Sequence, residues 1–140
     1  MTRATVTATT GFLLSKVGQA ATEAFAAKLE ALKLRPKHVG LLAAVAMIPS
    51  ATQQALGVAL GQVPSAIVAV VDDLEDIGAI RRVGDPDDRR RYSIELTAHG
   101  RSLLDRATKL AEQLDGELLA PLSAAERATL AKLLGRLRYG

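Results

Sequence analysis

The sequence predicts a mainly helical domain that contains one small β-hairpin. Between Asp85 and Thr97, an Asp-Pro-Asp turn leads into a segment in which Tyr92, Ile94 and Leu96 alternate with polar residues. This period of two indicates a half-buried strand, whereas the flanking segments repeat their apolar residues at intervals of three and four, as helices do. A chain of 140 residues is long enough for one domain with a hydrophobic core.

Composition narrows the class of protein. Apolar residues make up 49% of the chain, too many for a disordered segment, and no apolar run approaches the ~18 residues of a membrane span. Cysteine is absent, which excludes disulfides and thiol redox sensing, and His38 and His99 are too far apart to suggest a zinc site. We therefore expect no metal or other cofactor. Residues 1–10 do not resemble a signal peptide, so we expect a cytoplasmic protein.

Two helices are predicted before residue 50. The first covers residues 12–32 and the second residues 36–47, because Pro36 suits a first turn and Pro49 stops the helix. In the first helix, Leu13 and Val17 lie on an apolar stripe that can face the core, a partner subunit, or both. In the second, Val39, Leu42 and Ala46 are expected to face inward.

A helix-turn-helix is predicted next. Ser50 or Thr52 can cap a helix over residues 53–60, Gly61-Gln62-Val63 forms the turn, and Pro64 opens a second helix that Gly78 ends. The second helix should bury Ile67, Val70, Val71 and Leu74, which follow at i, i+3, i+4 and i+7. Its outward residues are then Ser65, Val68, Ala69, Asp72, Asp73 and Asp76.

The hairpin, over residues 80–97, is cationic. Ile80-Arg81-Arg82-Val83 supplies its first strand, and Arg89-Arg90-Arg91 lies just after its turn. From Arg81 to Arg91 there are five arginines against three aspartates, in a chain whose net charge is only +3. A cationic hairpin beside a helix-turn-helix has the shape of a DNA-binding wing.

The helices after the hairpin suggest a subunit interface. In residues 98–119 the apolar positions Leu104, Ala107, Ala111, Leu114 and Leu118 step by 3, 4, 3 and 4, a spacing suited to helix pairing. Ser123-Ala124-Ala125-Glu126 is a capping box for a last helix that carries Leu130, Leu133, Leu134 and Leu137. We expect a homodimer, with residues 10–33 and 98–140 as dimerisation helices and residues 34–97 as a winged helix-turn-helix lobe.

The wing carries a recognisable pattern. Asp88-Arg89-Arg90-Arg91-Tyr92-Ser93-Ile94-Glu95-Leu96-Thr97 fits Asp-x-Arg-x5-Leu-Thr and resembles the wing signature of the MarR (multiple antibiotic resistance regulator) family. The similarity extends upstream over residues 74–82 and downstream over residues 97–100. It implies a dimeric winged helix-turn-helix transcription factor, in which Asp88 holds arginines by ion pairing and Arg90 enters a minor groove.

The same resemblance implies a palindromic operator in double-stranded DNA and a small effector, often aromatic or phenolic, that binds beside the dimerisation helices. Phe12, Lys16, His38 and Leu42 are candidates to line that effector site. Each is also compatible with ordinary helix packing, and His38 with a partly exposed polar position.

The second helix of the helix-turn-helix departs from the family pattern. Where Ser, Thr and Arg are expected, it has Ala66-Ile67-Val68-Ala69, so that only Ser65 and Gln62 offer hydrogen bonds to bases. Val68 and Ala69 are suited to thymine methyl groups, and the outward aspartates would repel nearby phosphates. The predicted DNA contacts are Gln62, Ser65, Val68, Ala69, Arg81, Arg82, Asp88, Arg89, Arg90 and Arg91.

Two functions therefore stay open. The first is a repressor of nearby genes whose wing supplies most of the affinity for DNA. The second is a winged-helix module that binds a protein, or binds DNA with little sequence preference. No enzyme is expected, because the sequence has no nucleophilic cysteine, no glycine-rich phosphate loop and no paired histidine and carboxylate motif.

Overall fold

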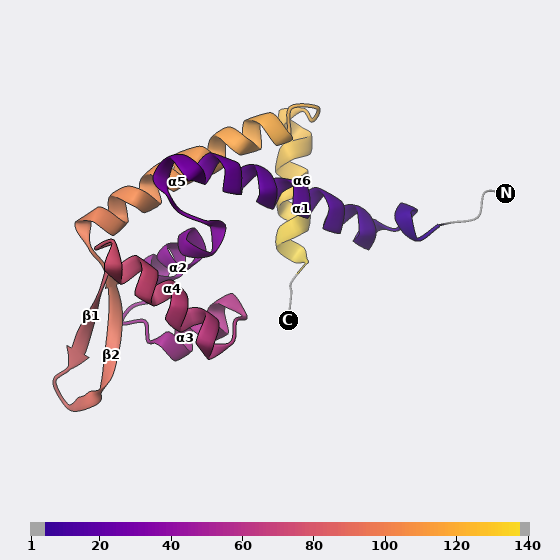
Figure 1. Ribbon diagram of the computed structural model, residues 1–140. Coiled ribbons are helices and arrows are strands. Elements are labelled where there is room, and N and C mark those ends of the chain that lie inside the picture. Colours follow the sequence, from indigo (N-terminus) through magenta and orange to yellow (C-terminus); the bar gives the residue numbers. More distant parts are fainter. Residues whose placement is uncertain (1–4, 138–140) are drawn as a thin grey trace.

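The computed structural model describes residues 5–137, and its helices with a single two-stranded hairpin confirm the predicted fold class (Figure 1). The long helices α1 and α5 lie side by side, and the lobe of α2, α3, α4 and the hairpin lies to one side of them. In chain order the elements are η1 (Val6–Ala8), α1 (Thr10–Leu29), η2 (Glu30–Leu32), α2 (Pro36–Met47), α3 (Gln53–Leu60), α4 (Pro64–Asp76), β1 (Ile80–Asp85), β2 (Asp88–Leu96), α5 (Ala98–Leu118) and α6 (Ala124–Arg136).

Side-chain caps determine where four helices begin. The hydroxyls of Thr9, Thr52 and Thr97 accept backbone N–H bonds from the first turns of α1, α3 and α5. Ser123 does the same for α6, and the Glu126 carboxylate accepts the Ser123 N–H at 2.9 Å, which is the predicted capping box. These bonds to Ser123 hold the pKa of Glu126 below its ordinary value. Each cap satisfies backbone donors that the helix leaves free.

The predicted helix-turn-helix is formed by α3 and α4. The chain bends by 112° between them, inside the range of roughly 90–120° typical of the motif. Gly61 ends α3 with φ at 61°, a left-handed conformation that glycine adopts without strain. The residues buried on α4 are Ile67, Val70, Val71 and Leu74, as their spacing predicted.

The buried face of α2 differs from the prediction. Ala46 was expected to face inward and is exposed, while Val39 is only half-buried. The residues that α2 buries are His38, Leu41, Leu42 and Val45. Apolar residues surround most of this helix, so periodicity alone could not select a face. The face is selected instead by the five elements that pack on α2, which are α1, α3, α4, β2 and α5.

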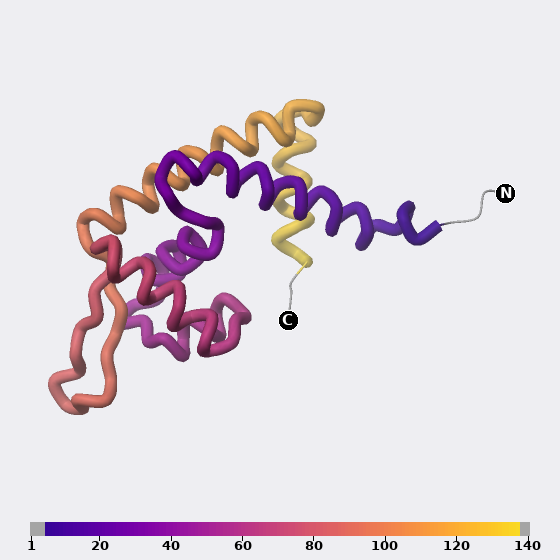
Figure 2. Tube along the Cα trace, viewed as in Figure 1, coloured from indigo at the N-terminus to yellow at the C-terminus, as the bar shows by residue number. Residues whose placement is uncertain are grey.

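The hairpin is antiparallel and its register is regular from the strand base to Gly84, which lies opposite Tyr92. The outer edge of β2 is held by the segment between α2 and α3, because the Ile94 N–H donates to the Ala51 carbonyl at 2.7 Å. Figure 2 follows the chain from α4 through the hairpin and directly into α5. The wing is therefore anchored at its base and projects freely beyond it.

Apolar surface remains on the helices outside the lobe. On α5, Ala107 and Leu114 are buried, but so is Leu103, which the predicted seam omitted in favour of the half-buried Leu104. Other predicted interface residues are half-buried, namely Ala111, Leu118 and Leu130. The rest are 43–56% exposed, namely Leu13, Val17, Leu133, Leu134 and Leu137.

Within residues 5–137, no single helix is long and apolar enough to cross a membrane, and α3 with α4 reaches that length and hydropathy only as a pair bent by 112°. The same stretch contains no group of three or more histidine, aspartate or glutamate side chains able to hold a metal ion.

Candidate nucleic-acid interface

The first half of α4 and the groove beside it form a neutral surface. Of the outward residues there, Ser65 and Ala69 are exposed and Val68 is 39% exposed. An open groove of about 650 Å³ lies between α3 and α4, and its lining includes Gln62 on the turn and Val58 on α3. The N-terminal residues of a recognition helix are the ones that reach base edges, so this half of α4 is the half that matters for DNA.

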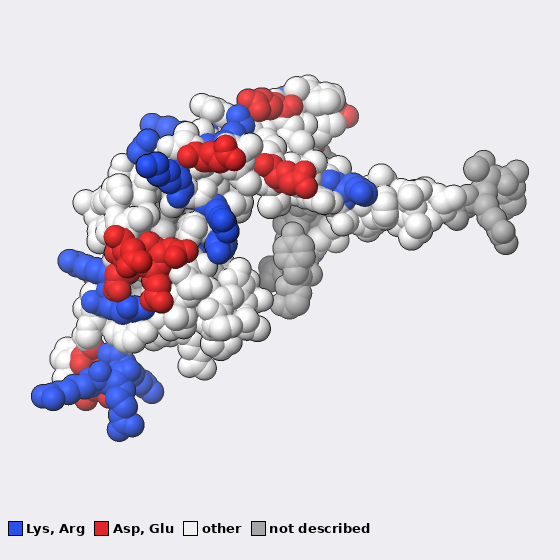
Figure 3. All heavy atoms as spheres, viewed as in Figure 1, with Lys and Arg blue, Asp and Glu red and all other residues white. Residues whose placement is uncertain are grey.

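The acidic residues of α4 all lie in its second half, and most of them are paired. Asp72 and Glu75 accept hydrogen bonds from the Arg82 guanidinium on β1 at 2.9 Å and 2.7 Å. The bond to Asp72, reinforced by the charge of Glu75, raises the pKa of Arg82. Asp76 stays exposed. Of the carboxylates that were expected to repel phosphates, Asp72 is thus ion-paired, and all of them lie away from the wing tip (Figure 3).

Arg82 has a different place from the other predicted DNA contacts. Its guanidinium lies 5.4 Å from the centre of the Tyr92 ring, and the Tyr92 hydroxyl donates to Gln53 Oε1 at 2.7 Å. The wing is thereby connected to both helices of the helix-turn-helix, to α4 through the two carboxylate partners of Arg82 and to α3 through the bond from Tyr92 to Gln53. Neither Tyr92 nor Gln53 was predicted as a site residue, although the alternation of β2 already placed Tyr92 on its inward side.

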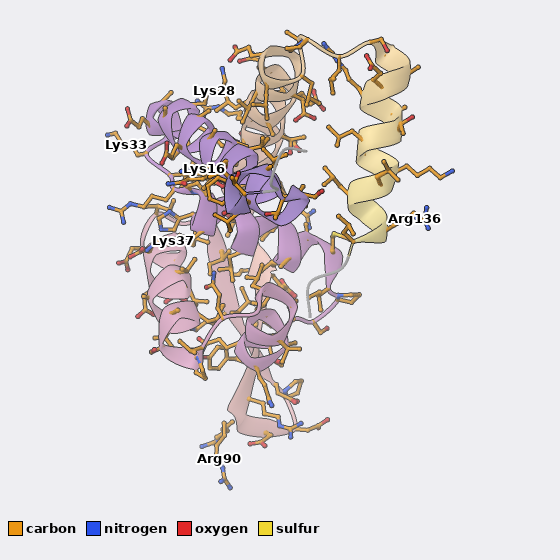
Figure 4. The ribbon with its side chains drawn as sticks, turned by 90° about the vertical axis from the view of Figure 1, so that its right-hand side faces the viewer. Lys16, Lys28, Lys33, Lys37, Arg90 and Arg136 are labelled. Atoms are coloured by element: carbon orange, nitrogen blue, oxygen red, sulfur yellow. The ribbon has the colours of Figure 1, made fainter. Side chains whose placement is uncertain are left out.

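The wing tip presents arginines. The register shifts between Gly84, which lies opposite Tyr92, and Asp85, which lies opposite Asp88. The three residues of β2 between these two pairs, Arg89, Arg90 and Arg91, have no partner in the register. Asp88 organises this loop, because its Oδ1 accepts the Arg90 N–H at 3.0 Å while its Oδ2 lies 3.9 Å from Arg91 Nε. All three arginines are exposed, and Arg90 extends beyond the end of the lobe (Figure 4). The tip is the blue end of the molecule in Figure 3.

Arg81 lies lower on the same hairpin. It faces Glu95 across the strands, and its guanidinium donates to Glu95 Oε2 at 3.0 Å and 3.3 Å. Its side chain is 66% exposed. An exposed ion pair of this kind contributes little to stability and is readily exchanged for a phosphate contact.

His38 is buried, and the expectation of a partly exposed polar position was wrong. Its Nδ1 accepts the Arg35 N–H at 3.0 Å at the start of α2, and its Nε2 lies 2.9 Å from Asp73 Oδ2 on α4. An accepting Nδ1 places the ring proton on Nε2, which donates to Asp73. This bond holds the pKa of Asp73 below its ordinary value. His38 thereby links the start of α2 to the recognition helix.

The four predicted effector residues have different surroundings. Leu42 is completely buried in the core, and the Lys16 ammonium lies 5.7 Å from the centre of the Phe12 ring on α1. His38 borders a depression of about 290 Å³ that Lys33 and Asp73 also line. Their shared role in an effector site remains a prediction.

The Leu-Thr end of the wing signature builds the junction between the lobe and α5. The Thr97 N–H donates to the Ala79 carbonyl at 3.1 Å, and the Thr97 hydroxyl donates to the Gly78 carbonyl. Gly100, one turn into α5, packs directly on the same strand base, since a Cβ there would lie 1.9 Å from the Ala79 oxygen. Only glycine permits this approach.

Comparison with known proteins agrees with this geometry. The profile of the MarR family matches residues 32–91, which span the lobe from the end of η2 to the wing arginines. A candidate transcriptional regulatory protein for the hcr operon of Thauera aromatica is 39% identical over 128 residues, 91% of this chain and 77% of that protein. The chain belongs to the MarR family. It is accordingly a DNA-binding transcriptional regulator and not an enzyme.

Two solved structures are similar along nearly the whole chain. The Mycobacterium tuberculosis MarR family protein Rv2887, solved in complex with DNA, has a TM-score of 0.81 and 27% identity, covering 94% of this chain and 98% of that one. CouR of Rhodococcus jostii RHA1, solved with p-coumaroyl-CoA bound, has a TM-score of 0.79 and 28% identity, covering 94% and 93%.

Proposed function

We propose that this MarR protein is a homodimeric repressor that binds a palindromic operator and leaves it when a small molecule binds. The observation that carries the proposal is the pairing of an exposed arginine tip with an acid-free first half of α4 on one lobe. Such a lobe can place α4 in a major groove and the tip on the adjacent minor groove and phosphates. A protein with this role works in the cytoplasm, where bacterial chromosomes lie.

Arg90 provides the direct test of the wing. Arg90→Ala should weaken binding to a selected operator duplex by about 1–3 kcal/mol, the scale of one good arginine contact. It should also reduce the slope of log affinity against log salt concentration by about 0.9, the loss of one phosphate neutralisation. Arg106→Ala removes the same charge from an exposed position on α5 and serves as control. Equal effects of the two substitutions would contradict a role for the wing tip.

The dimer is supported by the exposed leucines and valine of α1 and α6, since a stable single chain has no reason to expose so much apolar surface. Val17→Asp places a charge on α1 where the side chain is 56% exposed, so the fold of one chain should tolerate it. Sedimentation at micromolar concentration should show wild-type dimers and Val17→Asp monomers. Val58→Asp, on α3 where the side chain is 78% exposed, should stay dimeric. A wild-type monomer would refute the proposal.

The effector is proposed to be a small aromatic or phenolic anion. Family membership supports this, as does the aromatic acyl thioester bound by CouR. Lys16 and Phe12 on α1 offer a cation beside an aromatic ring, a suitable pair for such an anion. With 4-hydroxybenzoate as the probe, DNA release should be dose-dependent and weaker in Lys16→Met. Release that is unaltered in Lys16→Met would remove this residue from the site.

The alternative function is a winged-helix module that binds a protein, or binds DNA with little sequence preference. It is supported by the exposed valines of the helix-turn-helix, which would also suit a protein partner. A selected palindrome that binds at least a thousandfold more tightly than random duplex at fixed salt identifies a regulator, by the usual scale of specific recognition of about 10³–10⁷. A ratio near one identifies the low-specificity module.

A further inference from the structure

Apolar side chains dominate the part of the helix-turn-helix that faces DNA. Val58 on α3 is 78% exposed, Val63 at the start of α4 is 63% exposed, and Val68 on the outward face of α4 is 39% exposed. Val58 and Val63 line the same open groove, and Val68 shares its helix face with Ser65. Single exposed valines need no explanation, but three on one small motif are unusual for a surface that binds a polyanion.

Hydrogen-bonding side chains are scarce on the first half of α4, although Gln54 and Gln62 line the groove beside it. From Pro64 to Ala69 the only polar side chain is that of Ser65, and the turn before α4 contributes Gln62. Gln53 already accepts the Tyr92 hydroxyl, which occupies its amide oxygen. The guanine contacts that arginine or lysine make in the major groove therefore have no donor on the first half of α4.

Duplex DNA presents one apolar feature in its major groove, the C5-methyl group of thymine. We propose that this regulator selects its operator mainly through thymine methyl groups, with Val68 and Ala69 as the reading residues on α4 and Val63 at its start. Gln62 adds adenine recognition, since an amide side chain can bond to adenine N6 and N7. The inference rests on the proposed repressor function and specifies its ligand, A·T-rich half-sites.

Charge favours DNA over a protein as the occupant of this surface. The surface is flanked by the arginine tip of the same lobe, and the first two carboxylates that follow it on α4 both have partners, Asp72 with Arg82 and Asp73 with His38. In Figure 3 the wing tip is strongly cationic, the acidic patch lies over the second half of α4, and the surface over α3 and the first half of α4 is uncharged. The tip anchors phosphates, and the valines then approach the base edges without a charge to desolvate.

Replacing thymine by uracil tests the contribution of the C5-methyl group alone. A duplex selected from a random library by the wild-type protein is resynthesised with deoxyuridine at each thymidine of one half-site in turn. Deoxyuridine lacks only the C5-methyl group, so phosphates and minor groove, and with them the wing contacts, are unchanged. At each thymine that contacts α4, the uracil substitution should weaken binding of the protein to the duplex about fourfold. This is equivalent to about 0.8 kcal/mol, the value for burying one methyl-sized group.

A double-mutant cycle assigns the contact. In Val68→Ala the uracil penalty at the position read by Val68 should fall to less than twofold, whereas Ser65→Ala should keep the full penalty there. Both side chains are exposed, so neither change threatens the fold. A selected operator that binds equally with thymine and uracil overturns the inference and leaves the repressor function standing. A library from which no sequence is enriched overturns the proposed function, and this inference with it.

Discussion

Gly100 is the position where one added methyl group should cost the most. A Cβ built there lies 1.9 Å from the Ala79 carbonyl oxygen and 2.9 Å from its carbon, whereas ordinary contact begins at 3.4 Å. The obstacle is backbone, which cannot rotate away as a side chain can. In Gly100→Ala the start of α5 must therefore move off the strand base by about 1.5 Å, the difference between the 1.9 Å and 3.4 Å separations.

That movement breaks a backbone hydrogen bond. The Thr97 N–H bond to Ala79, now 3.1 Å long, cannot survive it. One lost backbone hydrogen bond costs about 1 kcal/mol, and forced overpacking costs about 1–3 kcal/mol more. Gly100→Ala should thus lower the free energy of unfolding by about 2–4 kcal/mol.

Urea unfolding followed by circular dichroism measures this directly. Gly116→Ala is the matched control, because Gly116 lies in the same helix with no heavy atom within 4 Å of its built Cβ. It should stabilise the protein by about 0.5–1 kcal/mol through helix propensity alone. A Gly100→Ala protein within 0.5 kcal/mol of wild type, a margin of about the usual surface effect, would show that α5 does not dock on Ala79 in this way.

Three further outcomes follow from the contacts of the lobe. Arg82→Lys should lower the free energy of unfolding by about 0.5–1 kcal/mol in urea titrations, because one ammonium cannot bridge the two partly exposed carboxylates; a neutral effect would mean that the bridge contributes nothing. The His38 hydrogen bond keeps the pKa of Asp73 below its ordinary 3.8, so its stabilisation is complete above that pH and lost as the pH falls through the lowered value. Asp73→Asn should therefore flatten the fall of Tm below about pH 4, and Asp76→Asn should not. Hydroperoxide should not cause a loss of DNA binding that thiol reductants reverse, since the chain has no cysteine.

Much of the fold was predictable because its signals are local. The capping box at Ser123, the glycine after α3 and the spacing of buried residues on α4 each depend on neighbours within one or two turns. The face of α2 was not predictable, because its apolar residues lie on most sides and the choice depends on five packing partners. His38 was misjudged for a related reason. Its partners are the start of its own helix and Asp73, 35 residues away.

The sequence motif of the wing predicted the arrangement of its tip but not the partners of Arg82. The turn and the alternation of apolar residues predicted the hairpin, and the resemblance gave Asp88 the role of holding arginines. Asp88 does order the tip, although chiefly through the Arg90 backbone N–H. Arg82 has the same residue type and was grouped with the tip arginines as a DNA contact. Only the tertiary structure reveals its two carboxylate partners on α4.

Those partners also explain how an acidic recognition helix can serve a DNA-binding protein. A helix carries partial positive charge at its N-terminus and partial negative charge at its C-terminus, so the N-terminal end of α4 is the end electrostatically suited to DNA. The acidic residues lie at the other end, where they add to the negative dipole and would be unfavourable alone. Arg82 pairs with both Asp72 and Glu75 there, and His38 bonds to Asp73. We therefore expect Arg82 to support DNA binding through α4 as well as by any direct contact, because its loss would leave two carboxylates of that helix without a cationic partner.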